Sequence, residues 1–329
     1  MILSPAFLSR SHRLYLSALW ALSIGSTLTV ASLTIQAAEF SLERETDALV
    51  IRAPDGKEAL RYQLTAPKNA GLSVESGCYF HPLRSPSGVA LTEVAPSDHP
   101  HHRGIFLAWV EMHGTTDADF WGWGQHAPKK DRRIVNRSLE DQKGTPTSAG
   151  FRAENDWMAG ETILLRESLT AEVHDERNLR ILDLVSTLKV DHDLTLSRWA
   201  FSGFCIRVPK TGKLEASGPE GAIHFRDPIH VKPETDWPAS PWYDYTLSFD
   251  DGAIAGVALL DHPLNPASQW HNHRGIRMMN PCIVAPSAVT LKPGQPLILR
   301  YRLIAHDGAL DAKQIQASWE SWSKGLTPR

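Results

Sequence analysis

The sequence predicts an all-β protein, a large antiparallel β-sandwich that ends in a short helix. Two observations predict it. Apolar and polar residues alternate, or nearly alternate, in several runs of strand length, and turn sequences rich in glycine and proline separate those runs. Successive runs are spaced by about 10 to 15 residues, which is typical of a large antiparallel sandwich.

The strand-like runs are spread over the chain beyond residue 38. They are Ala48–Ala53, Ala59–Ala66, Asn178–Val190, Gly252–Asp261 and Leu297–Gly308. One stretch, residues 309–325, is predicted as a helix instead, because its apolar residues fall near one helical face and Gly325 provides a stop. No alternation of strands with helices is visible, so a doubly wound parallel sheet is not expected.

The N-terminus has the pattern of an export signal. Arg10 and Arg13 precede a stretch, Leu14 to Ala38, that contains no charged residue. Its apolar part, residues 14–36, is also long enough to span a bilayer. We therefore predict a cleaved signal peptide or an uncleaved anchor over residues 1–38.

This N-terminal pattern sets the expected location and domain organisation. Residues 39–329 are predicted to form a single sandwich domain with its C-terminal helix at 309–325. The protein is expected in the periplasm or outside the cell, with membrane attachment only through residues 14–36.

The net charge and the tryptophan content indicate which kinds of molecule the protein binds. The net charge is −3, so no basic surface for nucleic acid is indicated. The chain has 11 tryptophans, which suggests aromatic walls around a core or a cleft. Because the C–H faces of sugars stack on indole rings, we expect a small-molecule or oligosaccharide substrate.

A histidine cluster opens the stretch "HPHHRGIFLAW", which begins at His99. Imidazoles titrate near neutral pH and suit proton transfer, so His101 and His102 are candidate acid–base catalysts. The planar fork of Arg103 would hold a carboxylate or a pair of hydroxyl groups of the substrate. The competing interpretation is a hydrogen-bonded polar corner that braces a loop.

The word "HRGI" occurs again in "WHNHRGIRMMN", from Trp270 to Asn280. Each copy ends a loop and begins an apolar run, so we expect both at the same end of the sandwich, facing one cleft. His273 and Arg274 would then bind substrate, with His102 and His273 within about two side-chain lengths of each other. The alternative is that the repeated word is coincidence.

Further candidates lie in other segments. "DHPLNP" begins at Asp261, and Asp261 with His262 would form a second catalytic pair, with Asn265 binding substrate; the alternative is a turn built by these residue types. Trp121 in "DFWGWG" would stack on a sugar, or else lie in the core.

Arg207 stands in the apolar strand "FCIRV". A buried charge needs a partner, so Arg207 is expected to reach an anionic ligand or a carboxylate, for which Asp244 is the candidate. Both residues are therefore included among the substrate-binding candidates.

A metal site is the main alternative to cofactor-free catalysis. His99 and His101, like His271 and His273, have the His-x-His spacing common among zinc and iron ligands. A carboxylate, Asp119 or Glu111, could be the further ligand of the first pair. Alternatively, the two pairs could together form one four-histidine site. Without such a site, no cofactor is expected.

Several longer motifs resemble a known family. They are "SDHPHHRGIFLAW", "DFWGWG", "FSGFCIRVP", "SPWYDYTLSF", "GVALLDHPLNPASQWH", "MMNPC" and "LKPGQPLILRYRLIAHDG". Together they resemble a secreted, uncharacterised family labelled "methane oxygenase PmoA", over nearly the whole chain beyond residue 38. The resemblance implies a galactose-mutarotase-like supersandwich and a setting in carbohydrate catabolism. A membrane-bound monooxygenase subunit has many membrane helices, whereas this chain has one hydrophobic segment.

These observations lead to one functional hypothesis and two alternatives. The hypothesis is a secreted carbohydrate-active enzyme that acts on a sugar or modified glycoside through histidine and carboxylate acid–base catalysis, as a hydrolase, lyase or epimerase. The alternatives are a non-catalytic carbohydrate-binding protein and a metal-dependent oxygenase or hydrolase with histidine ligands. The sequence contains no nucleophile-elbow, P-loop or dinucleotide-binding motif, so it gives no support for a serine hydrolase, a P-loop NTPase or a dinucleotide-binding protein.

Overall fold

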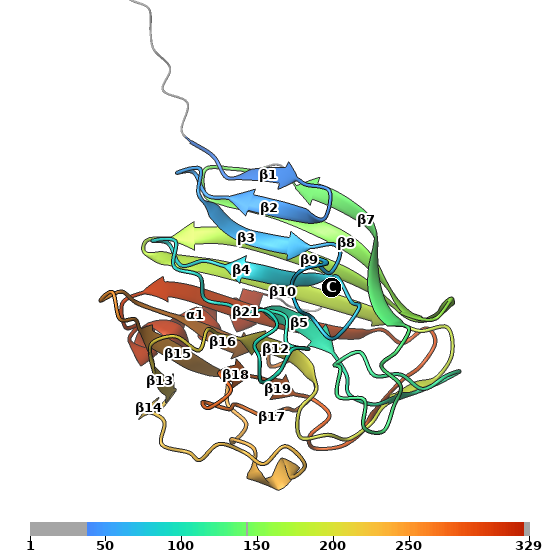
Figure 1. The fold of residues 1–329 in the computed structure, drawn as a ribbon. Helices are drawn as coiled ribbons and strands as arrows, with labels where there is room; N and C mark the ends of the chain where they lie inside the picture. Colours follow the sequence, from blue (N-terminus) through green and yellow to red (C-terminus); the bar gives the residue numbers. More distant parts are fainter. Residues whose placement is uncertain (1–37, 143, 326–329) are drawn as a thin grey trace, which may run out of the picture. The chain divides into compact units, whose positions relative to one another are not determined.

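Two large antiparallel sheets enclose the hydrophobic core. The computed structural model describes residues 38–142 and 144–325. The first sheet has seven strands, drawn at the front in Figure 1. In spatial order they are β1 (Ser41–Arg44), β2 (Ala48–Arg52), β3 (Glu58–Gln63), β4 (Tyr79–Leu83), β5 (Ile105–Ala108), β12 (Gly203–Arg207) and β18 (Met278–Met279).

The second sheet has nine strands and lies behind the first in Figure 1. In spatial order they are β14 (Gly221–Ala222), β13 (Lys213–Gly218), β15 (Trp242–Ser248), β16 (Ile254–Asp261), β21 (Leu297–Asp307), β10 (Leu179–Lys189), β9 (Thr162–Glu176), β8 (Ser148–Ala159) and β7 (Arg132–Gln142).

Short elements complete the fold. One small sheet contains β20 (Val289–Leu291), β11 (Leu194–Leu196) and β6 (Met112–His113), and another contains β17 (Gln269–Trp270) and β19 (Pro281–Cys282). The helical elements are a short 3-10 helix, η1 (Pro233–Thr235), and α1 (Ala312–Gly325).

Around β16 the nine-stranded sheet is buried on both faces, which explains the unbroken apolar run in that strand. Side chains alternate between the two faces of a strand. Val257 and Leu259 belong to the core between the sheets, whereas Ala258 and Leu260 pack against Ile315 of α1 on the opposite face. The helix therefore covers the outer face of the sheet with its own apolar side.

The predicted fold class is confirmed: an antiparallel sandwich with a C-terminal helix. The predicted helical stretch contains α1, and Ile315 and Trp322 are its buried residues, as the apolar spacing indicated. The signal or anchor was predicted over residues 1–38, and residues 1–37 of it lie outside the described residues. Within the described ranges, no helix has both the length and the apolar character needed to cross a membrane.

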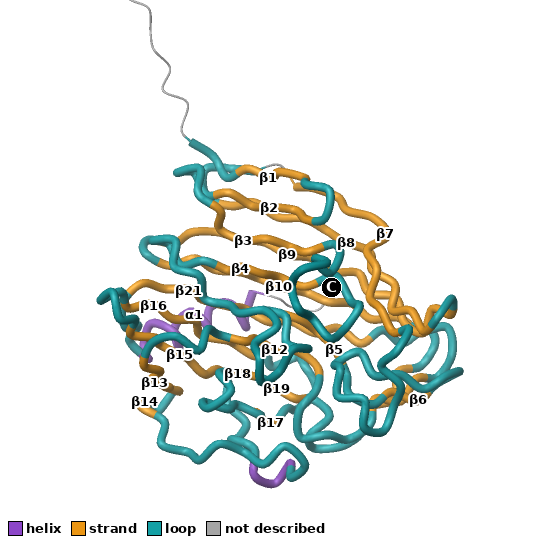
Figure 2. The backbone as a smooth tube through the Cα atoms, in the orientation of Figure 1, coloured by secondary structure: helices purple, strands orange, loops and turns teal. Residues whose placement is uncertain are grey.

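Strand β12 explains why two distant segments meet. It pairs with β5 on one side and β18 on the other, with Ile206 opposite Ile105 and also opposite Met279. The first "HRGI" word leads directly into β5, and the second is followed closely by β18. Both "HRGI" motifs therefore end beside Arg207. They lie in the region of Figure 2 where long loops gather around β12, β17, β18 and β19.

Candidate functional site

The first histidine loop is held tightly against the seven-stranded sheet. Its backbone closes through hydrogen bonds from Ala95 N to His102 O (2.8 Å) and from His102 N to His99 O (2.9 Å). Gly104 follows with a φ of 63°, and a Cβ at this position would lie 2.2 Å from the carbonyl oxygen of Phe80. Only glycine fits this approach, so Gly104 sets how closely the loop packs on β4.

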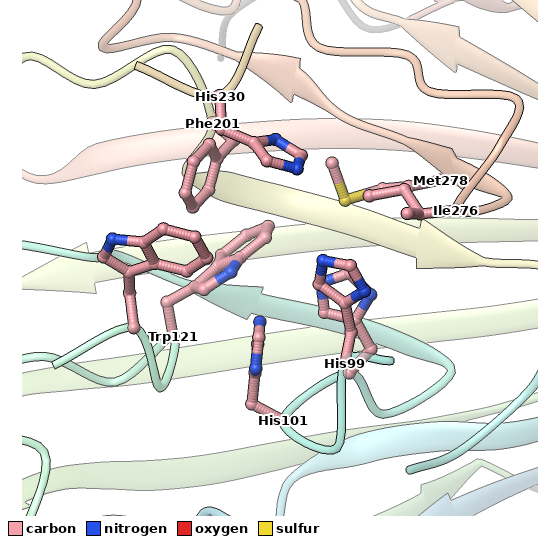
Figure 3. Close-up of a pocket in the computed structure, with 9 residues that line it drawn as sticks. His99, His101, Trp121, Phe201, His230, Ile276 and Met278 are labelled. Carbon is pink, nitrogen blue, oxygen red and sulfur yellow. The ribbon is translucent and has the colours of Figure 1, made fainter. Parts of the chain in front are cut away.

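The loop forms one wall of a small cavity of about 10 Å³. Figure 3 shows His99 and His101 on one side, Phe201 and His230 on the opposite side, and Ile276 and Met278 along a third. The complete lining is His99, His101, His102, Trp121, Trp123, Phe201, His230, Ile276 and Met278. Residues from both "HRGI" segments thus contribute to one cavity.

Arg207 fastens the histidine loop to β12. Its side chain is fully buried, and it donates hydrogen bonds to Asp98 Oδ1 (3.0 Å) and to His102 Nδ1 (3.2 Å). Lys210 also contacts Asp98, at 2.8 Å. Burial acts to raise the pKa of Asp98, but hydrogen bonds from Lys210 and His99 and the charge of Arg207 outweigh it, so this pKa is lowered.

The predicted pairing of Arg207 with Asp244 is therefore wrong. Asp244 lies on β15 and accepts hydrogen bonds from His306 Nε2 (2.9 Å) and Thr246 Oγ1 (2.8 Å). Asp98, the residue before the first histidine, takes the position expected for Asp244. Neither Asp244 nor Arg207 lines the cavity.

Arg103 also differs from its expected role. It is fully buried beneath the cavity, where it donates hydrogen bonds to the carbonyl oxygens of His101 (3.1 Å) and Phe120 (3.0 Å) and lies over the ring of Phe106. Burial lowers its pKa to about 10, which leaves it charged at neutral pH. Arg103 therefore braces the loop and does not line the space where a substrate would bind.

A hydrogen-bonded series reaches the opposite wall. Asp236 Oδ1 lies 2.6 Å from His271 Nδ1, and His271 Nε2 lies 2.9 Å from His230 Nδ1. The side chains of Asp236 and His271 are fully buried. The paired backbones of Trp237 and Trp270 place Asp236, at the end of η1, next to His271, at the end of β17. We call these three residues the Asp236–His271–His230 relay.

Burial raises the pKa of Asp236 to about 8, and the neighbouring charge of Glu234 adds to this. Burial lowers the pKa of His271 to about 3 and that of His230 to about 4, with nearby imidazoles contributing. Asp236 is thus the member of the relay with the strongest hold on a proton near neutral pH. Because the three groups are coupled, that proton belongs to the whole relay.

The histidines on the first wall are neutral at pH 7. Burial lowers the pKa of His101 to about 3, helped by the charges of its neighbours, and places that of His102 well below its usual value. His102 Nδ1 accepts from Arg207, so its ring proton is on Nε2. Within the described residues, Nε2 of His101 is buried without a hydrogen-bond partner. It is therefore free to accept a proton from a bound molecule.

The second "HRGI" word contributes less directly than expected. The ring of His273 stacks on His230, with centroids 5.4 Å apart, and its Nδ1 lies 3.1 Å from Asp227 Oδ2. The backbone nitrogen of Arg274 also donates to Asp227, and its guanidinium bonds to Phe225 O. His273 supports His230 from behind, and Arg274 points away from the cavity lining.

Aromatic residues form the remaining wall. Trp121 is buried and packs edge-on against His102, with centroids 5.8 Å apart. Trp123 is half-buried and contacts His101, Phe201 and His230. Both indoles line the cavity. Trp121 was expected either to stack on a sugar or to lie in the core. It is a buried core residue that also borders the cavity.

Asp119 has a structural position in this aromatic loop. Its carboxylate accepts hydrogen bonds from the backbone nitrogens of Gly122 (2.7 Å) and Gly124. Gly122 has a φ of 108°, and a Cβ there would lie 2.6 Å from both His101 Cβ and Val74 Cγ1. The tight "DFWGWG" turn thus lets His101 pack directly on its backbone.

The predicted second catalytic pair lies elsewhere, which corrects that hypothesis. Asp261 ends β16 and accepts hydrogen bonds from Asn265 and Ser268, each at 2.7 Å. The ring of His262 meets Trp322 of α1 edge-on, with centroids 4.8 Å apart. Asp261, His262 and Asn265 therefore build a turn beneath the C-terminal helix, the alternative that the residue types also allowed.

The geometry does not support the metal alternative. Within residues 38–142 and 144–325, no three His, Cys, Asp or Glu side chains are grouped as ligands for an ion. Both ring nitrogens of His271 are in hydrogen bonds, and His273 faces Asp227. Of the two carboxylate candidates, Asp119 caps backbone amides, and Glu111 bonds to His113 and Trp199.

Two important residues were missed in the sequence. His230 and Asp236 lie in the loop "DPIHVKPETDWP", which has no strand or helix periodicity and no His-x-His spacing. A single histidine in a proline-rich loop was the only local signal for His230. Asp236 becomes recognisable through its 2.6 Å contact with His271, which depends on chain segments far apart in sequence.

Comparison with known proteins places the chain in a family. The model of a family of unknown function, DUF6807, matches residues 50–320. The chain belongs to DUF6807. The description of DUF6807 states no activity, and the methane oxygenase label suggested by the sequence motifs does not appear in it. No curated protein matches the chain by sequence.

Solved structures similar to this DUF6807 member are distant from it. A galactose mutarotase related enzyme from Lactobacillus acidophilus has a TM-score of 0.37 at 10% identity, covering 82% of this chain and 100% of its own. An alpha-galactosidase from Lactobacillus brevis has a TM-score of 0.39 at 10% identity, and the match covers 85% of this chain and 41% of its own. A TPR-domain containing protein from Parabacteroides distasonis has a TM-score of 0.29 at 12% identity, and the match covers 83% of this chain and 48% of its own.

Proposed function

We propose that this protein is a carbohydrate-active enzyme that works by imidazole acid–base catalysis, with His230 as the acid and His101 as the base. One observation carries the proposal. The Asp236–His271–His230 relay ends at one wall of the cavity, and the unpartnered Nε2 of His101 belongs to the opposite wall. Burial lowers the pKa of both imidazoles, and the contrasting group is Asp236, whose raised pKa of about 8 supplies the proton that His230 passes on.

The proton balance follows from the hydrogen bonds. With Asp236 protonated, its O–H donates to His271 Nδ1, His271 Nε2–H donates to His230 Nδ1, and the proton of His230 is on Nε2. His230 then gives that proton to a substrate oxygen, while each partner behind it passes one proton forward and Asp236 becomes a carboxylate. His101 Nε2 takes a proton from the substrate or from water. Solvent returns one proton from His101 to the relay after each turnover.

The aromatic lining supports a sugar as the substrate. Trp121, Trp123 and Phe201 offer faces and edges to C–H groups, and the neutral imidazoles offer donors and acceptors to hydroxyl groups. None of the residues that line the cavity in the described part of the chain is a carboxylate. The acid–base work therefore falls to imidazoles, in contrast to the predicted partnership of histidine with Asp261.

The test is product formation from a broad panel. The protein is incubated with plant and algal oligosaccharides and their oxidised forms, and new products are sought by mass spectrometry, which also distinguishes hydrolysis, elimination and epimerisation. We expect His230→Gln and His101→Gln each to lower turnover about 100-fold or more. His192→Gln, in an exposed loop, is the matched control and should keep full activity.

Two outcomes would count against this assignment. Full turnover by either active-site variant would remove that histidine from the mechanism. Sugars that bind but return unchanged across the whole panel would favour a non-catalytic carbohydrate-binding protein.

A further inference from the structure

A second and larger groove lies next to the histidine cavity. Its volume is about 350 Å³. The residues that define its chemistry are Glu111, Gln125, His126, Arg198, Trp199 and Val231. None of these residues takes part in the proposed proton transfer.

The two spaces share their walls. Three chain segments each contribute to both: the Trp123 segment, the Phe201 segment and the His230 segment. Phe201 lies between the spaces, with its ring centroid 5.2 Å from that of Trp123 and 5.8 Å from that of Trp199. A molecule that emerges from the cavity past Phe201 therefore meets the groove.

Size indicates that the cavity holds only part of a ligand. At about 10 Å³ the cavity has room for about one water molecule, so only a hydroxyl group or ring oxygen of a ligand fits inside it. The groove, at about 350 Å³, falls within the roughly 300–1,000 Å³ typical of small-molecule pockets. A substrate that reaches His101 and His230 must therefore extend beyond the cavity. The adjoining groove provides room for the extension.

We propose that this groove is a second sugar subsite, and that the substrate is an uncharged glycoside of at least two rings. One ring would lie at the mouth of the histidine cavity and place an oxygen inside it, and the next ring would lie over Trp199. This inference rests on the proposed function, because it names the substrate class of the same site.

Trp199 has the features of a fixed platform. Its indole Nε1 donates to Glu111 Oε2 at 2.9 Å, and the ring of His126 packs beside it with centroids 5.2 Å apart. These contacts hold the half-buried indole in one orientation before any ligand arrives, which lowers the entropy lost on binding. An indole held in this way can stack on the C–H face of a sugar ring.

The polar groups of the groove suit hydroxyls. Arg198 is exposed, and its Nε donates to Ala285 O at 3.0 Å, which fixes the stem of the side chain. Gln125 accepts from the indole of Trp123 and keeps its amide donors. Glu111 and Arg198 carry opposite charges, so the groove has no net preference for a charged ring. Planar donors and acceptors around an aromatic platform favour a neutral sugar.

The test is equilibrium binding, measured apart from turnover. Calorimetric titrations of the His101→Gln protein would use cellobiose, maltose, lactose, gentiobiose and trehalose, together with methyl glucoside and methyl galactoside. We expect at least one disaccharide to bind about tenfold more tightly than the methyl glycosides. Trp199→Ala should remove this advantage and leave the affinity for methyl glycosides within about twofold.

Two further variants separate binding from folding. Trp199→Phe keeps an aromatic platform and should retain most of the disaccharide preference. Phe225→Ala changes an aromatic side chain, 42% exposed, that lines neither space, and it should change no affinity. Arg198→Ala, at an exposed position, should weaken disaccharide binding without lowering the melting temperature.

The outcomes are distinct from those of the catalytic proposal. Binding data that follow the expected pattern support the subsite even if no product forms. Equal binding of disaccharides and methyl glycosides, no binding by any disaccharide of the panel, or equal losses for both ligand types in Trp199→Ala would each overturn the subsite. The acid–base roles of His101 and His230 would still stand in those cases.

Discussion

Asp236 and His271 share a 2.6 Å hydrogen bond in a position where neither side chain is exposed to solvent. This contact joins the end of η1 to the end of β17 and continues through His271 Nε2 to His230. A buried carboxyl next to a buried imidazole is costly unless the pair shares a proton. In the proposed mechanism this pair stores the proton that reaches the histidine facing the cavity.

If the proposed function holds, replacing Asp236 by Asn should change the pH profile of turnover. Asp236 has a pKa raised to about 8, so the relay is protonated below that pH and His230 acts as an acid there. In the wild type, kcat/KM should fall as pH rises through about 8. We expect Asp236→Asn to lower kcat/KM about 10- to 100-fold and to remove that descending limb.

The measurement is kcat/KM between pH 5 and 9.5, supported by ¹H–¹⁵N NMR of the His230 ring tautomer. Asp236→Glu is the matched variant and should restore part of the limb. An unchanged profile in Asp236→Asn would show that Asp236 is only a structural neighbour of His271.

Replacing Gly122 by Ala should disturb His101. The new Cβ would lie 2.6 Å from His101 Cβ, and the φ of 108° is unfavourable for alanine. Gly221→Ala is a matched control, because its φ is 101° and no atom lies within 4 Å of the added Cβ. We expect Gly221→Ala to lower the free energy of unfolding by about 1–2 kcal/mol and Gly122→Ala by at least about 1 kcal/mol more.

Urea unfolding measures both variants, and turnover on the same samples reports His101. Equal destabilisation of the two proteins would mean that the clash at His101 is relieved without cost.

Replacing His262 by Gln should leave catalysis intact. Burial, together with the charge of Arg300, lowers the pKa of His262 to about 4, and its ring packs against Trp322 of α1. The lost contact should destabilise the protein by about 1–2 kcal/mol while turnover stays within about twofold of the wild type. Thermal unfolding and the product assay check the two parts. A loss of turnover comparable to that of His101→Gln would return His262 to the catalytic set.

Replacing Asp244 by Asn should remove a pH-dependent part of the stability. His306 Nδ1 faces Gly308 O at 2.8 Å and Nε2 faces Asp244 Oδ1 at 2.9 Å, so both ring nitrogens can donate when the imidazole is charged. Burial lowers the pKa of His306, but the hydrogen bond and charge of Asp244 outweigh it, and the net pKa is raised.

The sign of the effect follows from this raised pKa. The contribution is fully present below the unfolded pKa of about 6.5 and is lost as pH rises through the higher folded value. Unfolding free energies from urea titrations between pH 5.5 and 9 should therefore show a decline in the wild type that Asp244→Asn lacks. Parallel curves for the two proteins would contradict this account.

Local periodicity was sufficient to predict the fold class. The alternation in residues 178–190 and 297–308 became β10 and β21, because a strand with one face in the core must alternate. The apolar spacing at Ile315 and Trp322 likewise identified the buried face of α1. These features depend on neighbours within a few residues, so the sequence displays them directly.

The site was only half visible in the sequence. The histidine-rich motif pointed to His101 and His102, since three imidazoles in four positions are unusual wherever they occur. Local pattern also suggested Asp261 and His262, which the fold uses for a turn beneath α1. Residue type suggested both pairs alike, and only the direction of the side chains distinguished them.

The sequence by itself determined that strands, a terminal helix and two histidine-bearing loops would form. The tertiary structure decided which of those side chains meet. Strand β12 pairs with β5 and β18. The backbone pairing of Trp237 with Trp270 places Asp236 within hydrogen-bond distance of His271. Pairings of this kind join segments far apart in the chain, and they are selected by the packing of the whole core, which no local pattern of residues encodes.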